Sequence, residues 1–158
     1  MLFRSATRVF VKGQPSDLQK EVYTKVLKAF LNAISKKVGQ KTTGFNIDKT
    51  ARDILNKIKP EGFEFSHSLG HGIGISVHEN PPSLSPSKLG KTILKPYMCF
   101  TIEPGLYNEN YFGVRLENSC YLDENYKIQS FSNMCFEEKL IDFNLLTKKE
   151  KEVLSKWI

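Results

Sequence analysis

Apolar residues recur at helical spacing in two early segments of the chain. Residues 17–38 carry one wide apolar stripe, which begins after the N-cap residue Ser16 and stops at Gly39. Residues 46–58 carry a second stripe, and Pro60 lies just beyond its end. The pattern predicts two amphipathic helices that cover a sheet.

Short runs of β-branched and aromatic residues occur at the start of the chain and through its second half. They predict strands at residues 2–11, 98–103, 113–122 and 127–131. A capping box at Thr147 predicts a short last helix, with Leu154 and Trp157 on its buried side. Together with the two earlier helices, these segments predict an α+β fold.

Composition fits a single globular domain over residues 1–158, because 40% of the residues are hydrophobic and 25% are charged. The net charge is +6, but the lysines are scattered, so we expect no nucleic-acid partner. No segment approaches the roughly 20 apolar residues that span a bilayer, so we expect no membrane association and a cytoplasmic location. The three cysteines lack a CxxC pair, which argues against a thiolate metal site.

All three histidines of the chain, His67, His71 and His78, fall within one stretch of twelve residues. Glycines at positions 70, 72 and 74 are interleaved with them. Glycine lets a backbone approach a metal or a substrate closely. A lone histidine is more often an ordinary core or surface residue, but this cluster favours a functional site.

Glu103 and Glu117 each lie in an apolar strand segment, where an unpaired carboxylate costs several kcal/mol. If the two strands form a hairpin centred near Asn110, each glutamate lies seven residues from that centre. Directly opposed side chains have Cβ atoms about 5 Å apart. We therefore expect the two carboxylates to share one face and to be able to hold a cation.

Four motifs occur in the order and spacing of the pita-bread metallopeptidases, which include methionine aminopeptidase, prolidase and aminopeptidase P. They are GHGIG at 70–74, VHENP at 77–81, TIEPG at 101–105 and GVRLEN at 113–118. With LIDFNLLT at 140–147, the chain most resembles Xaa-Pro aminopeptidase. The resemblance implies a truncated pita-bread fold, in which a curved antiparallel sheet is covered by helices. Residues 1–158 would be the C-terminal part of one catalytic domain whose N-terminal half is missing.

The resemblance also implies roles for individual residues. His71, Glu103 and Glu117 take the positions of three of the family's five metal ligands. Glu103 would accept a proton from the attacking water, and the catalytic histidines would be His67 and His78. Arg115, His67 and His78 would bind the substrate. The implied cofactor is a divalent metal, Mn before Zn or Co.

Two positions depart from the family pattern. The family's second aspartate stands two places before a Thr-Arg pair, and this chain has Ser5 there. Serine is a poor replacement for a bridging carboxylate, so we expect one ion at most and weak or absent activity for the chain alone. Tyr97 occupies a turn where the family usually has glycine, and a positive φ suits tyrosine poorly.

The resemblance leaves two interpretations of function open. In the first, the chain is part of an Xaa-Pro aminopeptidase that acts on peptides with proline in second position, completed by a complementary N-terminal chain or a homodimer. In the second, it is an inactive pita-bread module that binds peptides or proteins. Retention of the three histidines and both glutamates favours the first.

Overall fold

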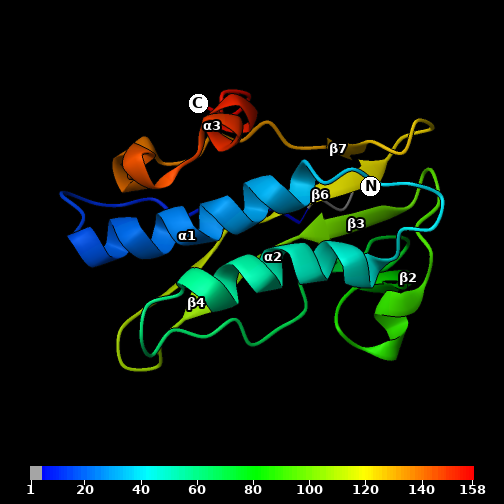
Figure 1. Ribbon diagram of the computed structural model, residues 1–158, viewed down its shortest axis with the longest axis horizontal. Helices are drawn as coiled ribbons and strands as arrows, with labels where there is room; N and C mark the ends of the chain where they lie inside the picture. The colour runs from blue at the N-terminus through cyan, green and yellow to red at the C-terminus, as the bar shows by residue number, and fades with distance from the viewer. Residues whose placement is uncertain (1–4) are drawn as a thin grey trace.

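The structure, a computed structural model, describes residues 5–158. Figure 1 shows helices packed beside a set of antiparallel strands. The helices are α1 (Asp17–Ile34), α2 (Gly44–Ile58) and α3 (Lys148–Leu154), and the short 3-10 turns are Lys88–Lys91, Glu138–Leu140 and Phe143–Leu145. The strands are β1 (Gly70–Gly72), β2 (Glu79–Leu84), β3 (Cys99–Ile102), β4 (Gly105–Tyr107), β5 (Gly113–Arg115), β6 (Asn118–Leu122) and β7 (Ile128–Ser130). Five strands form one sheet in the order β2-β1-β3-β6-β7, and β4 pairs with β5 in a second.

All three predicted helices are present, with shifted ends. Helix α1 stops at Ile34 instead of continuing to residue 38, and the Ser35 amide and hydroxyl both bond to the Leu31 carbonyl at its end. Helix α2 begins earlier than predicted, at Gly44, with Thr43 and Asn46 forming a capping box. The capping box at Thr147 opens α3 as expected.

The predicted hairpin is present, but its second strand is divided. Residues 113–122 were expected as one strand and form β5 and β6, which pair in different sheets. The predicted strand at 2–11 is wrong over its described part, residues 5–11. There, ladder pairing is confined to a bridge between Thr7 and Glu117, and residues 2–4 lie outside the described residues. Strand propensity gives a ladder only where a partner strand runs alongside.

Strands β1 and β2 were not predicted, because glycine and proline obscure their pattern. Proline is tolerated in β2 because this strand lies at the edge of the sheet. Gly70 of β1 has no room for a side chain, since a Cβ there would lie 1.9 Å from the carbonyl oxygen of Thr101. This close contact sets β1 against β3.

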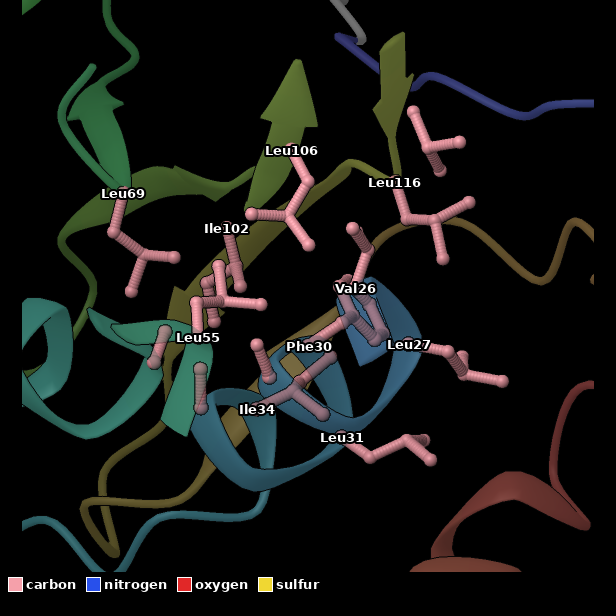
Figure 2. Packing of buried hydrophobic residues seen from close by; sticks show 14 of the residues in the cluster. Val26, Leu27, Phe30, Leu31, Ile34, Leu55, Leu69, Ile102, Leu106 and Leu116 are labelled. Atoms are coloured by element: carbon pink, nitrogen blue, oxygen red, sulfur yellow. The ribbon is translucent and has the colours of Figure 1, made fainter. Parts of the chain in front are cut away.

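The core lies between the helices and the strands. Figure 2 shows Phe30 and Val26 of α1 and Leu55 of α2 directed toward Ile102 of β3 and Leu106 of β4. All five side chains are fully buried. This packing confirms the predicted α+β class with an antiparallel sheet covered by helices. Within residues 5–158, no helix is long and apolar enough to cross a membrane.

Candidate metal centre and active site

Three side chains from separate segments converge at one point. His71 lies on β1, Glu103 follows β3, and Glu117 precedes β6. One potential ligand atom from each residue lies within 4.8 Å of those of the other two. The backbone thus brings together one imidazole and two carboxylates, a donor set suited to a divalent ion.

The two glutamates face each other because of the hairpin register. Ile102 pairs with Asn118, and Gly105 pairs with Arg115. Continuing either ladder by one or two residues sets Glu103 opposite Glu117, so the register expected from the sequence is confirmed. Both carboxylates lie where the hairpin passes from one sheet to the other.

Local hydrogen bonds orient the ring of His71. Its Nδ1 lies 2.9 Å from the carbonyl oxygen of Gly72, and since a carbonyl can only accept, Nδ1 carries the proton. The lone pair is then on Nε2, which lies 3.5 Å from Oε1 of Glu103. A backbone partner on the other ring nitrogen is typical of metal-ligating histidines.

The site concentrates negative charge in a partly dry environment. Glu117 is only 4% exposed, and the Glu103 side chain is also largely covered. Burial and, secondly, the nearby charge of Glu117 raise the pKa of Glu103, although a hydrogen bond from Thr101 and the proximity of His71 lower it. Two close carboxylates favour either a cation between them or protonation of one of them.

Hydroxyl groups take up both oxygens of Glu117. The Ser5 hydroxyl donates to Oε1, and the Thr7 hydroxyl donates to Oε2 over 2.5 Å. The backbone around Ser5 is fixed by Ser119, whose hydroxyl accepts from the Ser5 amide and donates to the Ser5 carbonyl. Ser5 therefore lies against the candidate ligand Glu117, and its side chain carries no charge.

A hydrogen bond to Tyr107 connects His67 to the rest of the site. Its Nδ1 lies 2.7 Å from the Ser68 carbonyl oxygen, so Nδ1 is the donor, and Nε2 accepts from the Tyr107 hydroxyl over 2.8 Å. Burial raises the pKa of that tyrosine, whereas Arg115 lowers it. The chain of contacts leads back to the carboxylates, because Nη1 of Arg115 lies 3.9 Å from Oε2 of Glu103.

His78 lies on the exposed loop between β1 and β2. Its ring centroid is 4.0 Å from that of His71. The structure thus places His78 and Arg115 at the rim of the site, where both are open to solvent.

The residues present fit one divalent ion. His71 offers a free Nε2, and Glu103 and Glu117 offer oxygens on the same side, which gives three protein ligands and leaves further positions for water or substrate. A second hard ion prefers several more oxygens, and a serine hydroxyl at position 5 is a weak ligand. The geometry therefore favours a mononuclear site.

Two polar residues of the site escaped the sequence analysis. Thr7 follows Ser5 by two residues, so strand alternation alone would place both on one face and could have identified it. Tyr107 closes the TIEPGLY segment at 101–107, but nothing local indicates that its hydroxyl meets His67, which is 40 residues away in sequence.

Comparison with known proteins gives consistent matches. Residues 4–124 match the model of metallopeptidase family M24. The chain is 34% identical over 164 residues to a probable Xaa-Pro aminopeptidase P of Neurospora crassa and 40% identical over 120 residues to an Xaa-Pro dipeptidase of Pyrococcus furiosus. These alignments cover 95% and 75% of this chain, but only 24% and 33% of the relatives.

A solved structure extends the comparison to the fold. The X-prolyl aminopeptidase of Caenorhabditis elegans, described as a cytosolic enzyme with a di-nuclear active site, superposes with a TM-score of 0.80 at 26% identity. The match covers 96% of this chain and 27% of the nematode protein. The whole described architecture therefore has a counterpart in a much longer enzyme.

Proposed function

This chain belongs to metallopeptidase family M24, and on that premise we propose that it forms part of an Xaa-Pro aminopeptidase, which removes an N-terminal residue that precedes proline. Residues 1–158 would be the C-terminal part of one pita-bread catalytic domain, in keeping with the 24–33% of the length of the relatives that it covers. A cytoplasmic location is part of the proposal and agrees with the nematode relative described as cytosolic.

The observation that carries the proposal is the convergence of His71, Glu103 and Glu117 within 4.8 Å. Three segments separated along the chain supply these side chains, and two of them are carboxylates in a largely buried position. A dry carboxylate pair destabilises a fold unless a cation or a proton compensates it. A site for one divalent ion, Mn before Zn or Co, explains the arrangement.

The other residues of the site have roles that follow from their chemistry. A divalent ion bound here would supply Lewis-acid activation of a carbonyl or a water. Glu103, with its raised pKa, is suited to accept a proton from the attacking water. His78 and Arg115 would donate hydrogen bonds to the substrate at the open rim, and His67 would help to place it.

Ser5 supports a second candidate, an inactive module that binds peptides or proteins. Its hydroxyl and that of Thr7 already satisfy both oxygens of Glu117 without a metal. Among residues 5–158, no buried side-chain polar atom of the site lacks a hydrogen-bond partner. The fold is thus compatible with a metal-free state, in which the site would serve for recognition only.

The experiment that separates the two candidates compares the purified wild-type chain with two variants, Ser5→Asp and Ser5→Asn. Asparagine has the shape of aspartate but no charge, so the second variant is the control for the first. Metal content is measured after dialysis against Mn²⁺, Co²⁺ or Zn²⁺, and hydrolysis is measured with an Xaa-Pro peptide. We expect at most one ion and little turnover for the wild type. Ser5→Asp should bind ions more tightly and gain a second one, whereas Ser5→Asn should not.

Each outcome decides between the candidates. Metal binding by the wild type, lost in Glu117→Gln, supports the proposed metallopeptidase. Absence of metal in both the wild type and Ser5→Asp supports the binding module. Rapid turnover by the wild type with two bound ions would refute the argument that Ser5 limits the site to one.

The proposal includes a partner chain, either a complementary N-terminal chain or a second copy. An apolar pocket of about 170 Å³ lies between residues 9–11 and β5, and Phe10 beside it is mostly exposed. Exposed apolar surface next to a strand edge is a pairing surface. Light scattering of the purified chain tests this part, and a monodisperse monomer would count against it.

A further inference from the structure

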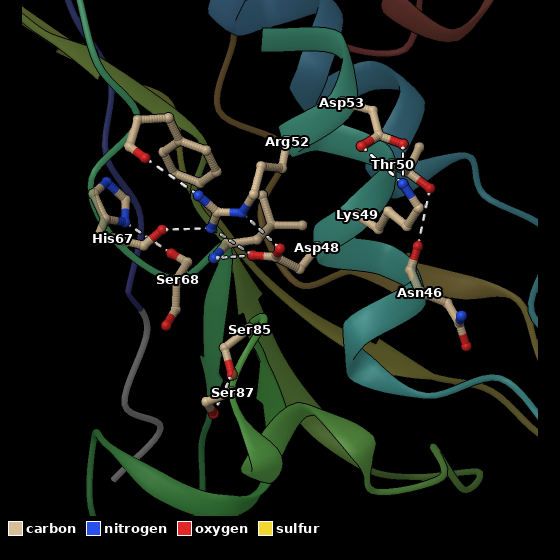
Figure 3. Close-up of polar contacts among 12 residues, drawn as sticks. Asn46, Asp48, Lys49, Thr50, Arg52, Asp53, His67, Ser68, Ser85 and Ser87 are labelled. Carbon is tan, nitrogen blue, oxygen red and sulfur yellow. Dashed lines mark hydrogen bonds and ion pairs between the residues drawn. The ribbon is translucent and has the colours of Figure 1, made fainter. Parts of the chain in front are cut away.

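Helix α2 carries a buried ion pair on the side that faces the histidine segment. Arg52 donates from Nε to Oδ2 of Asp48 and from Nη2 to Oδ1, each over 2.8 Å. Asp48 is only 1% exposed. Figure 3 shows this pair between the helix and the chain around His67. A bidentate pair of this kind fixes geometry strongly, since Asp48 is removed from water and the Arg52 side chain is only 22% exposed.

The pair binds the backbone of the segment that leads into β1. Arg52 donates to the carbonyl oxygens of Phe65, over 3.2 Å, and of His67, over 2.8 Å. Asp48 accepts from the amide of Leu69 over 3.0 Å. Three alternate residues of one short segment, residues 65–69, are therefore held by two side chains, which fix the position of that backbone.

Ring contacts extend this hold to the side chain of His67. The Arg52 guanidinium lies 4.3 Å from the centroid of the Phe65 ring. The centroids of the Phe65 and His67 rings are 5.0 Å apart, and the two rings are nearly perpendicular. The His67 ring is thus confined by Phe65 on one side and hydrogen-bonded to Tyr107 at Nε2. Its Nδ1 donates to the Ser68 carbonyl, which lies within residues 65–69, the segment that Asp48 and Arg52 bind.

We infer that Asp48 and Arg52 are positioning residues that set the rotamer and the tautomer of His67. The fork of Arg52 binds the carbonyls of Phe65 and His67, and the carboxylate of Asp48 binds the Leu69 amide, which shares a peptide unit with the Ser68 carbonyl. With these peptides fixed, the Ser68 carbonyl selects the Nδ1–H tautomer and leaves Nε2 as an acceptor. The role in substrate placement rests on the proposed function, but the orientation of the ring does not.

A second ion pair on the same helix provides a matched control. Lys49 and Asp53 have the same spacing of four residues as Asp48 and Arg52, but their side chains are 56% and 60% exposed. Figure 3 shows them on the far side of α2 from His67. Lys49→Gln removes one positive charge from α2, as Arg52→Gln does, but leaves the hydrogen bonds to residues 65–69 intact.

The test compares Arg52→Gln, Arg52→Lys and Lys49→Gln by NMR of the histidine ring nitrogens in the metal-free chain. The chain has three histidines, and His67→Gln assigns the signals of His67. In Arg52→Gln we expect the ratio of Nδ1–H to Nε2–H tautomer at His67 to fall about two- to tenfold, the range of one hydrogen bond. Lys49→Gln should leave it unchanged.

Arg52→Lys keeps the charge and loses the planar fork, so it is the variant to use if Arg52→Gln fails to fold. It should shift the tautomer ratio in the same direction. An unchanged His67 spectrum in a folded Arg52 variant would overturn the inference and leave the pair a role in stability alone. If the wild type hydrolyses Xaa-Pro peptides, the Arg52 variants should show a rise in KM that is larger than their fall in kcat.

The NMR result does not depend on hydrolysis. A chain that binds no metal, either as the wild type or as Ser5→Asp, but in which Arg52 still controls the His67 ring would refute the proposed function and keep the inference. An active chain with an unaffected ring would do the reverse.

Discussion

Tyr97 is held in a left-handed backbone conformation immediately before β3. Its φ is 68°, a region in which the side chain of any residue other than glycine crowds the backbone. The turn is anchored in this conformation, because the Tyr97 amide donates to the carbonyl of Leu122 over 2.6 Å. The aromatic ring contributes little packing stabilisation to offset this cost, since the residue is 69% exposed. Tyr97→Gly should therefore stabilise the chain.

The magnitude follows from two opposing effects. A left-handed residue with a Cβ costs roughly 1–2 kcal/mol. Glycine loses more backbone entropy on folding, which offsets roughly 0.5–1 kcal/mol of that gain. The net stabilisation should be about 0.5–1 kcal/mol, which corresponds to a rise in Tm of about 1–4 °C for a chain of this size.

Urea denaturation and thermal melting of the wild type, Tyr97→Gly and Tyr97→Ala measure the effect. Tyr97→Ala removes the same ring but keeps the Cβ, so the difference between the two variants isolates the backbone. We expect the glycine variant to be about 1 kcal/mol more stable than the alanine variant. Equal stability of the two variants would refute the reasoning, because the ring and not the backbone would then decide.

Two further predictions concern close packing and pH. Gly70→Ala should destabilise the chain by about 1–3 kcal/mol and weaken metal binding, because the new Cβ would meet the Thr101 backbone and displace β1. Burial raises the pKa of Glu150, but hydrogen bonds from Lys28, Thr147 and Asn32 outweigh it and leave the pKa below its usual value. Glu150→Gln should therefore cost stability above about pH 4.3, and the difference from wild type should shrink as the pH falls through the lower, folded-state pKa.

Each of these predictions has a control within the chain. A Cβ at Gly39 would meet no atom within 4 Å, so Gly39→Ala should leave stability and metal binding nearly unchanged. Equal losses in the two glycine variants would contradict the packing argument. Glu152→Gln alters an exposed residue of the same helix as Glu150, and pH titration of its unfolding free energy should follow the wild type. If the stability difference between Glu150→Gln and the wild type stayed constant down to about pH 3, well below the ordinary glutamate pKa, the lowered pKa of Glu150 would not be its cause.

Short-range patterns predicted the helices and the hairpin that carries Glu103 and Glu117, but not the strand that carries His71. The three helices followed from apolar periodicity and capping residues. The register of Glu103 and Glu117 followed from a centre at Asn110, because an antiparallel hairpin pairs residues at equal distances from its turn. The resemblance predicted the unfavourable backbone at Tyr97, because the family usually has glycine in that turn.

Other features were hidden because their signals are weak or non-local. Strand β2 contains two prolines, and β1 is two glycines around His71, so neither has a strand-like composition. The division of residues 113–122 between two sheets depends on which strands lie beside each half. Strand propensity alone cannot locate that division, since it reflects packing against neighbours.

The sequence by itself determined the family and the helices, because the motifs and the apolar periodicity involve residues that are close together along the chain. The tertiary structure alone decided that Ser5, 112 residues from Glu117, donates its hydroxyl to the carboxylate that a metal would use. It also decided that Asp48 and Arg52 hold the backbone around His67. Such contacts depend on how whole elements pack, and no periodicity or motif encodes the distance between residues that meet only in the folded chain.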